Sequence, residues 1–533
     1  MPSGVRFQLL VSGSLVVTWH PLDARPRVEA IACSVTRAAR DCKPAEVAAD
    51  TSCENGSVAG TPPPPAPPIV APTWRQRGAL LLGRAAAQAS RRLHRGGGTA
   101  LPGVVSTALA PNVVELFSAL GHGVVTVTGT NGKTTTSHLL TAAAERANLR
   151  PLTNRSGSNL ERGLASTLVD AVDASGRLLE PASRLGVLEV DEAALPALWP
   201  RLRPRVGVFL NLFRDQLDRY GEIDSIAEGW RAMVASDPGS PTLVLNADDP
   251  SLQPLRVAAR GPVVAFGIED ASVALPGAEH ASDARFCACG STFAYERVYV
   301  GHVGHWRCRG CGVARSTPEV AARSIVLRED GTDLELVTPE GTANVSLPLV
   351  GLYSVYNALA AAAAALAVGV PLEAVRETLE ASAPAFGRQE RITTYGREVR
   401  LLLAKNPAGL NAVIRTLLAG DERLRLLWLL NDGIQDGEDV SWIYDADFEL
   451  LAGRDIEVVV SGSRAEDLAL RLHLAGIEPA FVEAHTSTAL EESLALVPRD
   501  GRLDVLATYT AMLELREMVA ARAGAQHYWE APR

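Results

Sequence analysis

The sequence of 533 residues predicts an α/β protein with two successive domains. Three observations predict this fold class. Short apolar runs alternate with helical patterns, a glycine-rich turn separates one run from a following helix, and a second series of runs begins after Gly387. We therefore expect a first domain over about 76–386 and a second domain over 387–533.

The strands expected in the first domain are near-continuous apolar runs, which is typical of a parallel sheet buried on both faces. They are "GVLEV" (186–190), "VGVFLNL" (206–212) and "TLVLNA" (242–247). Near the end of this domain, "LPLVGLYSVYNALAAAAAALAVGV" (347–370) indicates a turn followed by an alanine-rich helix. The second domain repeats the strand–helix alternation, so we expect a Rossmann-like α/β fold there; its runs are 399–404, 424–430, 456–462 and 503–509.

Residues 1–75 differ from the rest of the chain and are expected to form a disordered extension. The stretch ends in "TPPPPAPPIVAPT", which favours polyproline II. "FQLLVSGSLVVTW" imitates a signal peptide, but no convincing small-residue cleavage site follows it, so secretion is not favoured. The net charge of −10 argues against a nucleic-acid partner, and no apolar run reaches the roughly 18 residues of a membrane span.

A phosphate-binding loop is predicted in "VTVTGTNGKTTTSHLL" (125–140). A strand, a glycine turn and the start of a helix bring backbone N–H groups and the helix dipole together on an anion. Lys133 would contact the β- and γ-phosphates of ATP, and Thr134 would bind Mg²⁺. The residues expected to hold the nucleotide are Gly129, Thr130, Asn131, Gly132, Lys133, Thr134 and Thr135.

Lysine is rare in this chain, which has only Lys43, Lys133 and Lys405 among 51 basic residues. Where arginine serves as the ordinary surface cation, a retained lysine indicates a need for a compact ammonium group. We therefore expect Lys405, like Lys133, to be functional.

The cysteines fall into two sets, and the second set is compact. "FCACGSTFAYERVYVGHVGHWRCRGCG" (286–312) contains Cys287 and Cys289, then 18 residues, then Cys308 and Cys311. Two such pairs predict a structural zinc ribbon inserted at about 283–317. The first pair lacks the usual two intervening residues, so His302 or His305 could replace one of its thiolates.

The phosphate loop lacks one glycine of the strict Walker pattern, since Val127 stands there, and "TGTNGKTT" resembles the compressed loop of the Mur ligase superfamily. "LEVDEA" (188–193), "NLFRDQLDRYGE" (211–222), "LNADDP" (245–250), "GLYSVYNALAA" (351–361) and "FGRQER" (386–391) resemble further blocks of that family. The resemblance implies a magnesium ligand at Glu189 and nucleotide contacts at Asn246, Asp249, Asn357 and Arg388.

Three departures from the superfamily pattern are visible. Gln216, in the 211–222 block, replaces the histidine of the family's "DHLD" block. No lysine lies between Lys133 and Lys405, which excludes the carbamylated lysine that some members use at a second metal. The usual N-terminal UDP-binding domain has no counterpart, so the substrate's head group must be held in another way.

The second domain narrows the resemblance. "LAKNPAGLN" (403–411), "LNDGIQDGEDVSWIYDADFE" (430–449) and "TYTAML" (508–513), together with the cysteine insert, resemble the MurT family, the ligase subunits of lipid II isoglutaminyl synthases. The resemblance implies ATP-dependent amidation of the D-glutamate α-carboxylate of lipid II to D-isoglutamine, through an acyl phosphate, in the cytoplasm at the inner face of the membrane.

The same resemblance implies a partner, because ammonia would come from glutamine cleaved by a separate amidotransferase subunit of the GatD type. An aspartate of the second domain would complete that partner's Cys-His pair, with Asp439 the first candidate and Asp445 the second. Two alternatives stay open: a single-chain Mur-type ligase that adds an amino acid, similar to folylpolyglutamate synthase, and a non-catalytic ATP-binding scaffold.

Overall fold

The structure is a computed structural model of the chain. It describes residues 5–6, 18–19, 71–92, 101–154, 158–214, 223–277, 283–383, 388–420 and 423–524. The chain divides into two compact units, Met1–Pro63 and Pro64–Arg533. In the first unit, β1 (Val5–Arg6) and β2 (Thr18–Trp19) pair antiparallel. Most of the predicted extension, as well as Gln216 and Gly387, lies outside the described residues.

A nine-stranded sheet organises the first part of the second unit, in the order β13-β12-β11-β8-β7-β6-β3-β5-β4. Strands β3 to β8 run parallel to one another, and β11 is parallel to β8. Strand β12 is antiparallel to both β11 and β13, so this edge of the sheet is antiparallel. The three predicted strands are confirmed as β5, β6 and β7. The bounds are β3 Val124–Thr128, β4 Arg150–Thr153, β5 Arg184–Glu189, β6 Val206–Phe209, β7 Thr242–Asn246, β8 Val263–Ile268, β11 Val320–Leu327, β12 Thr332–Thr338 and β13 Gly341–Leu347.

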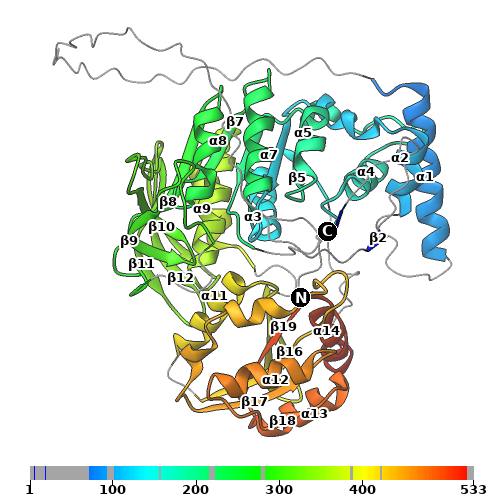
Figure 1. Cartoon of the computed structure of the whole chain (residues 1–533). Helices are drawn as coiled ribbons and strands as arrows, with labels where there is room; N and C mark the ends of the chain where they lie inside the picture. Colours follow the sequence, from blue (N-terminus) through cyan, green and yellow to red (C-terminus); the bar gives the residue numbers. More distant parts are fainter. Residues whose placement is uncertain are drawn as a thin grey trace, which may run out of the picture. The chain divides into compact units, whose positions relative to one another are not determined.

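Helices cover both faces of this sheet (Figure 1). Successive side chains of β3 point to opposite faces of the sheet, and both faces are apolar. Val125 and Val127 belong to the core under one set of helices, and Val124 belongs to the core under the other. The first set is α3 (Lys133–Arg146), α9 (Leu352–Ala367) and α10 (Leu372–Glu380). The second is α1 (Trp74–Arg92), η1 (Val113–Ala119), α4 (Glu161–Asp170), α5 (Leu195–Leu202), α7 (Ile223–Ser236) and α8 (Gln253–Ala258). Helix α2 (Leu101–Leu109) packs against α1 and α4.

The cysteine-rich insert forms an antiparallel hairpin of β9 (Phe293–Val300) and β10 (Val303–Cys308), located in the chain between β8 and β11. It is fixed to the loop after β7, because the Trp306 indole N–H donates to the Ala247 carbonyl at 3.0 Å and the Gly304 N–H donates to the Asp248 carbonyl at 2.8 Å. The insert therefore packs against the segment that contains "LNADDP" (245–250).

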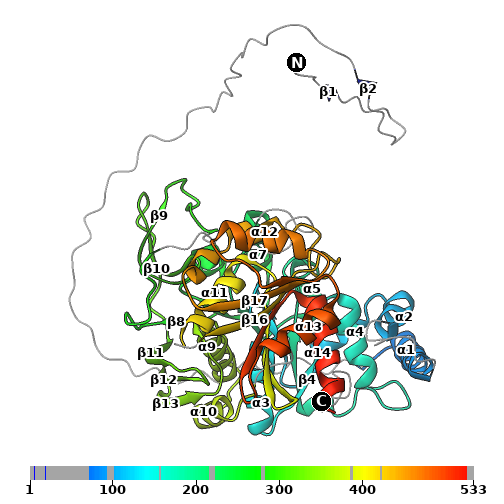
Figure 2. The same cartoon turned by 90° about the horizontal axis from the view of Figure 1, so that it is seen from below.

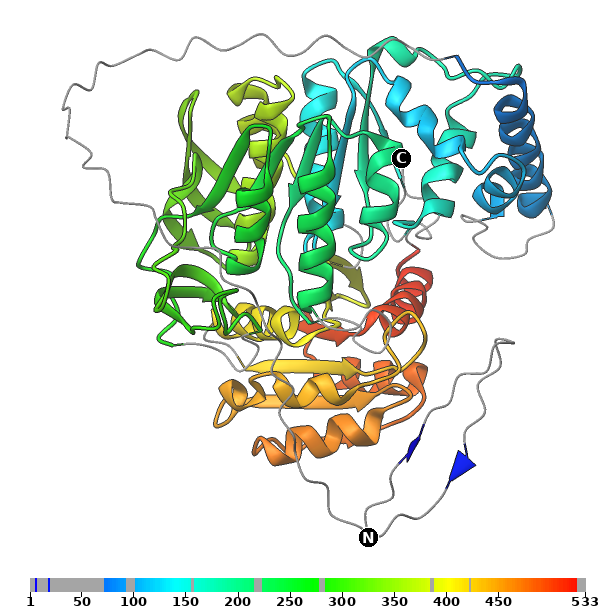
Figure 3. The same cartoon turned by 45° about the horizontal axis from the view of Figure 1, so that its top comes forward.

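A second, six-stranded sheet has the order β14-β15-β19-β16-β17-β18, and its strands from β15 to β18 are parallel (Figures 2 and 3). All four predicted runs are confirmed as strands. Helices α11 (Pro407–Leu418) and α12 (Ala465–Leu474) cover one face, and α13 (Thr486–Leu496) and α14 (Tyr509–Ala523) cover the other. The strands are β14 Arg388–Thr394, β15 Arg397–Leu403, β16 Leu424–Leu429, β17 Ile456–Ser461, β18 Phe481–Val482 and β19 Arg502–Ala507.

Within the described residues, no single helix is long and apolar enough to cross a membrane. One pair, α2 with η1, reaches the length and composition of a span only when taken together, and it is bent by 94°.

Candidate active site

The predicted phosphate loop connects the end of β3 to the start of α3, so the N–H groups of the first turn of α3 face the loop and have no acceptor within the helix. Gly132, directly before the helix, has φ of 92°. A Cβ at this position would lie 2.0 Å from Asn357 Oδ1, so the tight turn and the close approach of α9 both require glycine.

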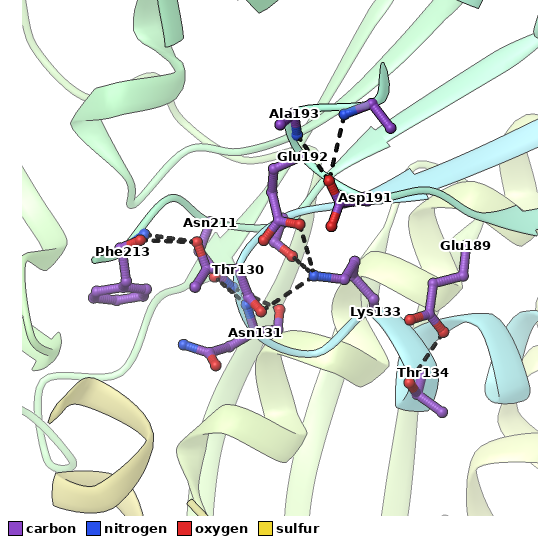
Figure 4. A network of polar contacts seen from close by, with 12 residues as sticks. Thr130, Asn131, Lys133, Thr134, Glu189, Asp191, Glu192, Ala193, Asn211 and Phe213 are labelled. Carbon is purple, nitrogen blue, oxygen red and sulfur yellow. Dashed lines mark hydrogen bonds and ion pairs between the residues drawn. The ribbon is translucent and has the colours of Figure 1, made fainter. Parts of the chain in front are cut away.

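Asn211, at the end of β6, fastens the loop from the neighbouring strand (Figure 4). Its amide oxygen accepts from the Asn131 N–H at 2.9 Å, and its amide nitrogen donates to the Asn131 carbonyl at 3.0 Å. Thr130 is held in the same way, since its hydroxyl oxygen accepts from the Phe213 N–H at 2.9 Å. This support was not predicted, although both partners belong to the quoted "NLF" segment.

Thr134 and Glu189 form a pair suited to a divalent cation. The Thr134 hydroxyl donates to a Glu189 carboxylate oxygen at 3.0 Å, and Glu189 is buried at the end of β5. Asn154 fixes the Glu189 backbone by accepting from its N–H at 2.8 Å and donating to its carbonyl at 2.9 Å. A hydroxyl and a carboxylate are the hard oxygen ligands that Mg²⁺ prefers, so the two predicted ligands fit that ion.

Lys133 is buried and its ammonium group contacts three acceptors, as Figure 4 shows in part. Its Nζ lies 2.6 Å from the Gly129 carbonyl oxygen, 3.4 Å from the Thr130 carbonyl oxygen and 3.0 Å from Glu192 Oε2. Glu192 is also buried, and its own carbonyl accepts from the Trp230 indole N–H at 2.9 Å. Sequence reasoning missed Glu192, even though it lies in the quoted "LEVDEA" block.

A cavity of about 120 Å³ lies next to the loop. Its lining brings together predicted residues from distant parts of the chain, because α9 and the segment after β15 both reach the loop. The lining also includes Gln389, Phe213 and Tyr356, which were not predicted. The predicted residues in the lining are Asn131, Gly132, Thr135, Asn246, Asn357 and Lys405.

The loop meets the second domain through Asn406, the residue after Lys405. The Asn406 amide nitrogen donates to Asn131 Oδ1 at 3.0 Å, and its Oδ1 accepts from the Gly409 N–H at 2.8 Å at the start of α11. The "AKNP" segment therefore caps a helix and contacts the phosphate loop with one side chain.

Two predicted nucleotide contacts are placed differently from the others. Asp249 is buried and used internally: one carboxylate oxygen accepts from the Leu212 N–H at 2.8 Å and the other from the Ser251 N–H at 2.8 Å. Arg388 begins β14, but its side chain is outside the described part of the structure, while the next residue, Gln389, lines the cavity. The assigned roles of Asp249 and Arg388 remain predictions.

The four cysteines of the insert come together as one cluster, with their sulfur atoms all within 4.8 Å of one another. The backbone N–H of Ser291 lowers the pKa of Cys289 to about 6, and the N–H groups of Cys311 and Gly310 lower that of Cys308. Burial instead raises the pKa of Cys287 to about 12. The donor set of four thiols fits a structural zinc ion.

Neither histidine considered as a substitute ligand belongs to this cluster. His305 Nε2 lies 2.9 Å from the Ile268 carbonyl oxygen. His302 is buried, with Nε2 3.3 Å from Asp249 Oδ1 but without the alignment of a hydrogen bond. The alternative with a histidine ligand is therefore wrong for this arrangement, and the predicted set of four cysteines is the one that the fold brings together.

Three aspartates of the acidic segment after β16 are held in three different ways. Asp439 is exposed, and its Oδ1 accepts from the Ser441 N–H at 2.8 Å. Asp445 forms an ion pair with Arg214 at 3.1 Å. Asp436 is buried and accepts from the Thr510 N–H at 2.7 Å, which ties the segment to the start of α14.

The fold has counterparts among solved structures. A pseudomurein peptide ligase type C from Methanothermus fervidus covers 75% of this chain and 78% of its own at 22% identity, with a TM-score of 0.55. MurF from Thermotoga maritima, solved in complex with ADP, covers 79% and 84% at 15% identity, with a TM-score of 0.56. Residues 127–305 match the family model of the Mur ligase middle domain. The class is therefore that of the Mur-type ligases, which are ATP-dependent enzymes.

The particular family follows from the second domain and from full-length relatives. Residues 403–512 match the model of the MurT ligase C-terminal domain. The lipid II isoglutaminyl synthase (glutamine-hydrolyzing) subunit MurT of Streptococcus pneumoniae is 33% identical over 83% of this chain and 96% of its own length, and that of Staphylococcus aureus strain N315 is 31% identical over 84% and 98%. The chain belongs to the MurT family.

Proposed function

We propose that this chain amidates the D-glutamate α-carboxylate in the stem peptide of lipid II, giving D-isoglutamine at the inner face of the cytoplasmic membrane, with ATP as the activating substrate. The observation that carries the proposal is the pairing of Thr134 with Glu189 at 3.0 Å beside Lys133, on the phosphate loop of a MurT-family chain. The two relatives are named as MurT subunits of a glutamine-hydrolysing lipid II isoglutaminyl synthase, and this supports ammonia delivery by a GatD-type partner in a heterodimer.

The reaction consists of two displacements. A carboxylate oxygen of the substrate attacks the γ-phosphorus of ATP and ADP leaves, giving an acyl phosphate; ammonia then attacks the acyl carbon, phosphate leaves and the nitrogen loses a proton. Lys133 offsets charge on the phosphates, and Thr134 with Glu189 would hold the Mg²⁺ that supplies Lewis-acid chemistry. Lys405 also lines the cavity next to the loop, and this supports a role for its charge in the reaction.

The direct test combines the purified chain with lipid II, ATP and ammonium, followed by mass spectrometry of the stem peptide. Amidation of the peptide, with ATP hydrolysis that depends on the acceptor, is the expected result. Incorporation of an amino acid would instead support the single-chain ligase, and ATP binding without acceptor-dependent hydrolysis would support the non-catalytic scaffold.

We propose further that the cysteine cluster holds one structural zinc ion. Four thiolates leave no open coordination position, which favours a structural role over a catalytic one. Freshly purified protein is expected to contain about one zinc per chain by metal analysis. Cys308→Ser should lower the yield of soluble protein more than it lowers ATP affinity in the soluble fraction. Protein purified without chelators that contains no zinc would contradict the assignment.

Glu192 is expected to compete with the nucleotide for Lys133. An ammonium group has three donors, and one of the contacts of Lys133 is already with this carboxylate. Glu192→Gln removes the negative charge facing incoming phosphates, so ADP should bind about tenfold more tightly, the equivalent of one charge-assisted hydrogen bond. Calorimetric titration with ADP measures the change, and adenosine, which carries no phosphate, should show none.

The matched control for this experiment is Glu228→Gln. It makes the same change of charge on the exposed surface of α7, where Glu228 pairs with Arg231. ADP affinity should be unaltered in that variant. An equal or weaker ADP affinity in Glu192→Gln would show that Glu192 does not compete with phosphate.

A further inference from the structure

A stretch of 60 residues, 55–114, contains no acidic residue. Between Glu54 and Glu115 there is no aspartate or glutamate, whereas the whole chain has a net charge of −10. The basic residues of the stretch are the arginines 75, 77, 84, 91, 92 and 95. Helices α1 and α2 lie in this stretch, so both belong to a strongly basic part of an acidic protein.

Large apolar side chains are exposed on both helices, beside exposed arginines on α1. On α1, Trp74 is 85% exposed and Leu82 is 55% exposed, and their separation of eight residues places them on the same face of the helix. On α2, Leu101 is 44% exposed, with Val104 and Leu109 similarly accessible. Their opposite faces are buried through other residues, such as Leu80, so the exposed residues are additional to those that hold the helices in place.

The helix pair forms a firm platform. A Cβ on Gly83 of α1 would lie 2.3 Å from Ser106 Oγ of α2, so the two helices are in close contact. Figure 1 shows them side by side. The Ser106 hydroxyl donates to the Ala79 carbonyl at 3.2 Å. On the inner side, the Gly103 N–H donates to Ser166 Oγ of α4 at 2.9 Å. The pair is therefore fixed to the body through α4, and its apolar residues stay on the outside.

Among the described residues, Arg75, Arg77 and Arg84 of α1 form no ion pair and donate to main-chain carbonyls instead. Arg75 donates to the Leu109 carbonyl at 3.1 Å, and Arg84 donates to the Val172 carbonyl at 3.0 Å. Both side chains are exposed, and both acceptors are neutral main-chain oxygens. A partner of negative charge is therefore favoured at this surface over a neutral one.

We propose that the outward face of α1 and α2 docks onto an anionic lipid bilayer. Helices that lie in a membrane interface combine tryptophan and leucine with arginine and lack acidic residues. Their apolar side chains lie among the lipid chains, and their guanidinium groups lie at the lipid phosphates. This goes beyond the proposed function, since a lipid-linked substrate can be bound without any contact between protein and bilayer.

The test measures flotation of the full chain with vesicles that contain no lipid II. The chain should bind vesicles of equal parts phosphatidylglycerol and phosphatidylcholine, bind pure phosphatidylcholine weakly, and be released as salt screens the charges. The double substitution Trp74→Ser with Leu82→Ser should weaken binding at least about tenfold, because it removes the inserted apolar side chains. Val257→Ser, at another exposed apolar residue on α8, should bind as the unchanged chain does.

Unchanged melting temperatures would show that the variants are folded. The proposal is overturned if the full chain does not bind phosphatidylglycerol vesicles. It is also overturned if the double variant binds these vesicles as well as the unchanged chain does, because binding would then be due to nonspecific attraction of charge alone. It is also overturned if the double variant keeps vesicle binding but no longer binds the amidotransferase subunit, since the face is then a protein interface. Because these vesicles carry no substrate, failure here leaves the amidation proposal untouched.

Discussion

Replacement of Lys133 by alanine is expected to reduce ATP-dependent amidation by about a thousandfold or more, the scale on which loss of a key transition-state donor acts. Lys133→Arg should fail as well. The Nζ site is buried between two loop carbonyls and Glu192, with contacts of 2.6 to 3.4 Å, and a planar guanidinium cannot fit a cradle built for a compact ammonium. Initial rates of amidation at saturating ammonium measure both effects.

Arg146→Ala is the control on the same helix. Arg146 lies at the other end of α3, where it forms a half-exposed ion pair with Glu377, so its loss removes a cation from α3 without touching the loop. Its amidation rate should stay within about twofold of the unchanged chain, as expected of a surface ion pair. Near-normal activity in Lys133→Arg would show that the loop does not select a compact cation.

The strands that the sequence predicts correctly are those in which burial on both faces leaves a continuous apolar run. In β3 all five residues are buried, and the four strands named in the second domain have buried centres in the same way. The antiparallel edge was not predicted. In β12, Thr332–Thr338, buried and half-buried residues alternate. Because polar residues such as Asp333 and Glu335 occupy the less buried face, the strand contains no continuous apolar run from which it could be predicted.

In the candidate site, too, features formed by adjacent residues could be predicted, whereas contacts between residues far apart in the chain could not. The phosphate loop can be predicted from the sequence because its glycines, lysine and threonine are adjacent in the chain and act through local backbone geometry. The contacts that support it are not adjacent: Glu192 lies 59 residues from Lys133, and Asn211 lies 80 residues from Asn131. A quoted block such as "LEVDEA" shows which carboxylates exist, but strand order decides that Glu189 meets Thr134 while Glu192 meets Lys133.

Asp439→Asn is expected to impair amidation driven by glutamine by about a hundredfold or more, while amidation driven by free ammonium stays unchanged. A triad carboxylate orients a histidine and does not touch ATP. The structure favours Asp439 for this role, since it is exposed and hydrogen bonds from Ser441 lower the pKa of its carboxyl, which keeps it ionised. Asp445 is already paired with Arg214. Rates with each nitrogen source, in the presence of the amidotransferase subunit, measure the split.

The expectation that a partner is needed rests on the thiols of this chain. A glutaminase of the Cys-His type needs a thiolate nucleophile. No cysteine follows Cys311 in the sequence, and the four thiols of the insert are gathered in one cluster suited to a metal. The other three, Cys33, Cys42 and Cys53, lie in the predicted extension, outside the described residues. The chain alone should therefore use ammonium but not hydrolyse glutamine, and adding the partner should confer glutamine use. Glu438→Gln, which changes the same charge one residue away, should leave both reactions intact. Equal loss of both activities in Asp439→Asn would place Asp439 in the ligase site, and glutamine hydrolysis by the isolated chain would overturn the two-subunit assignment.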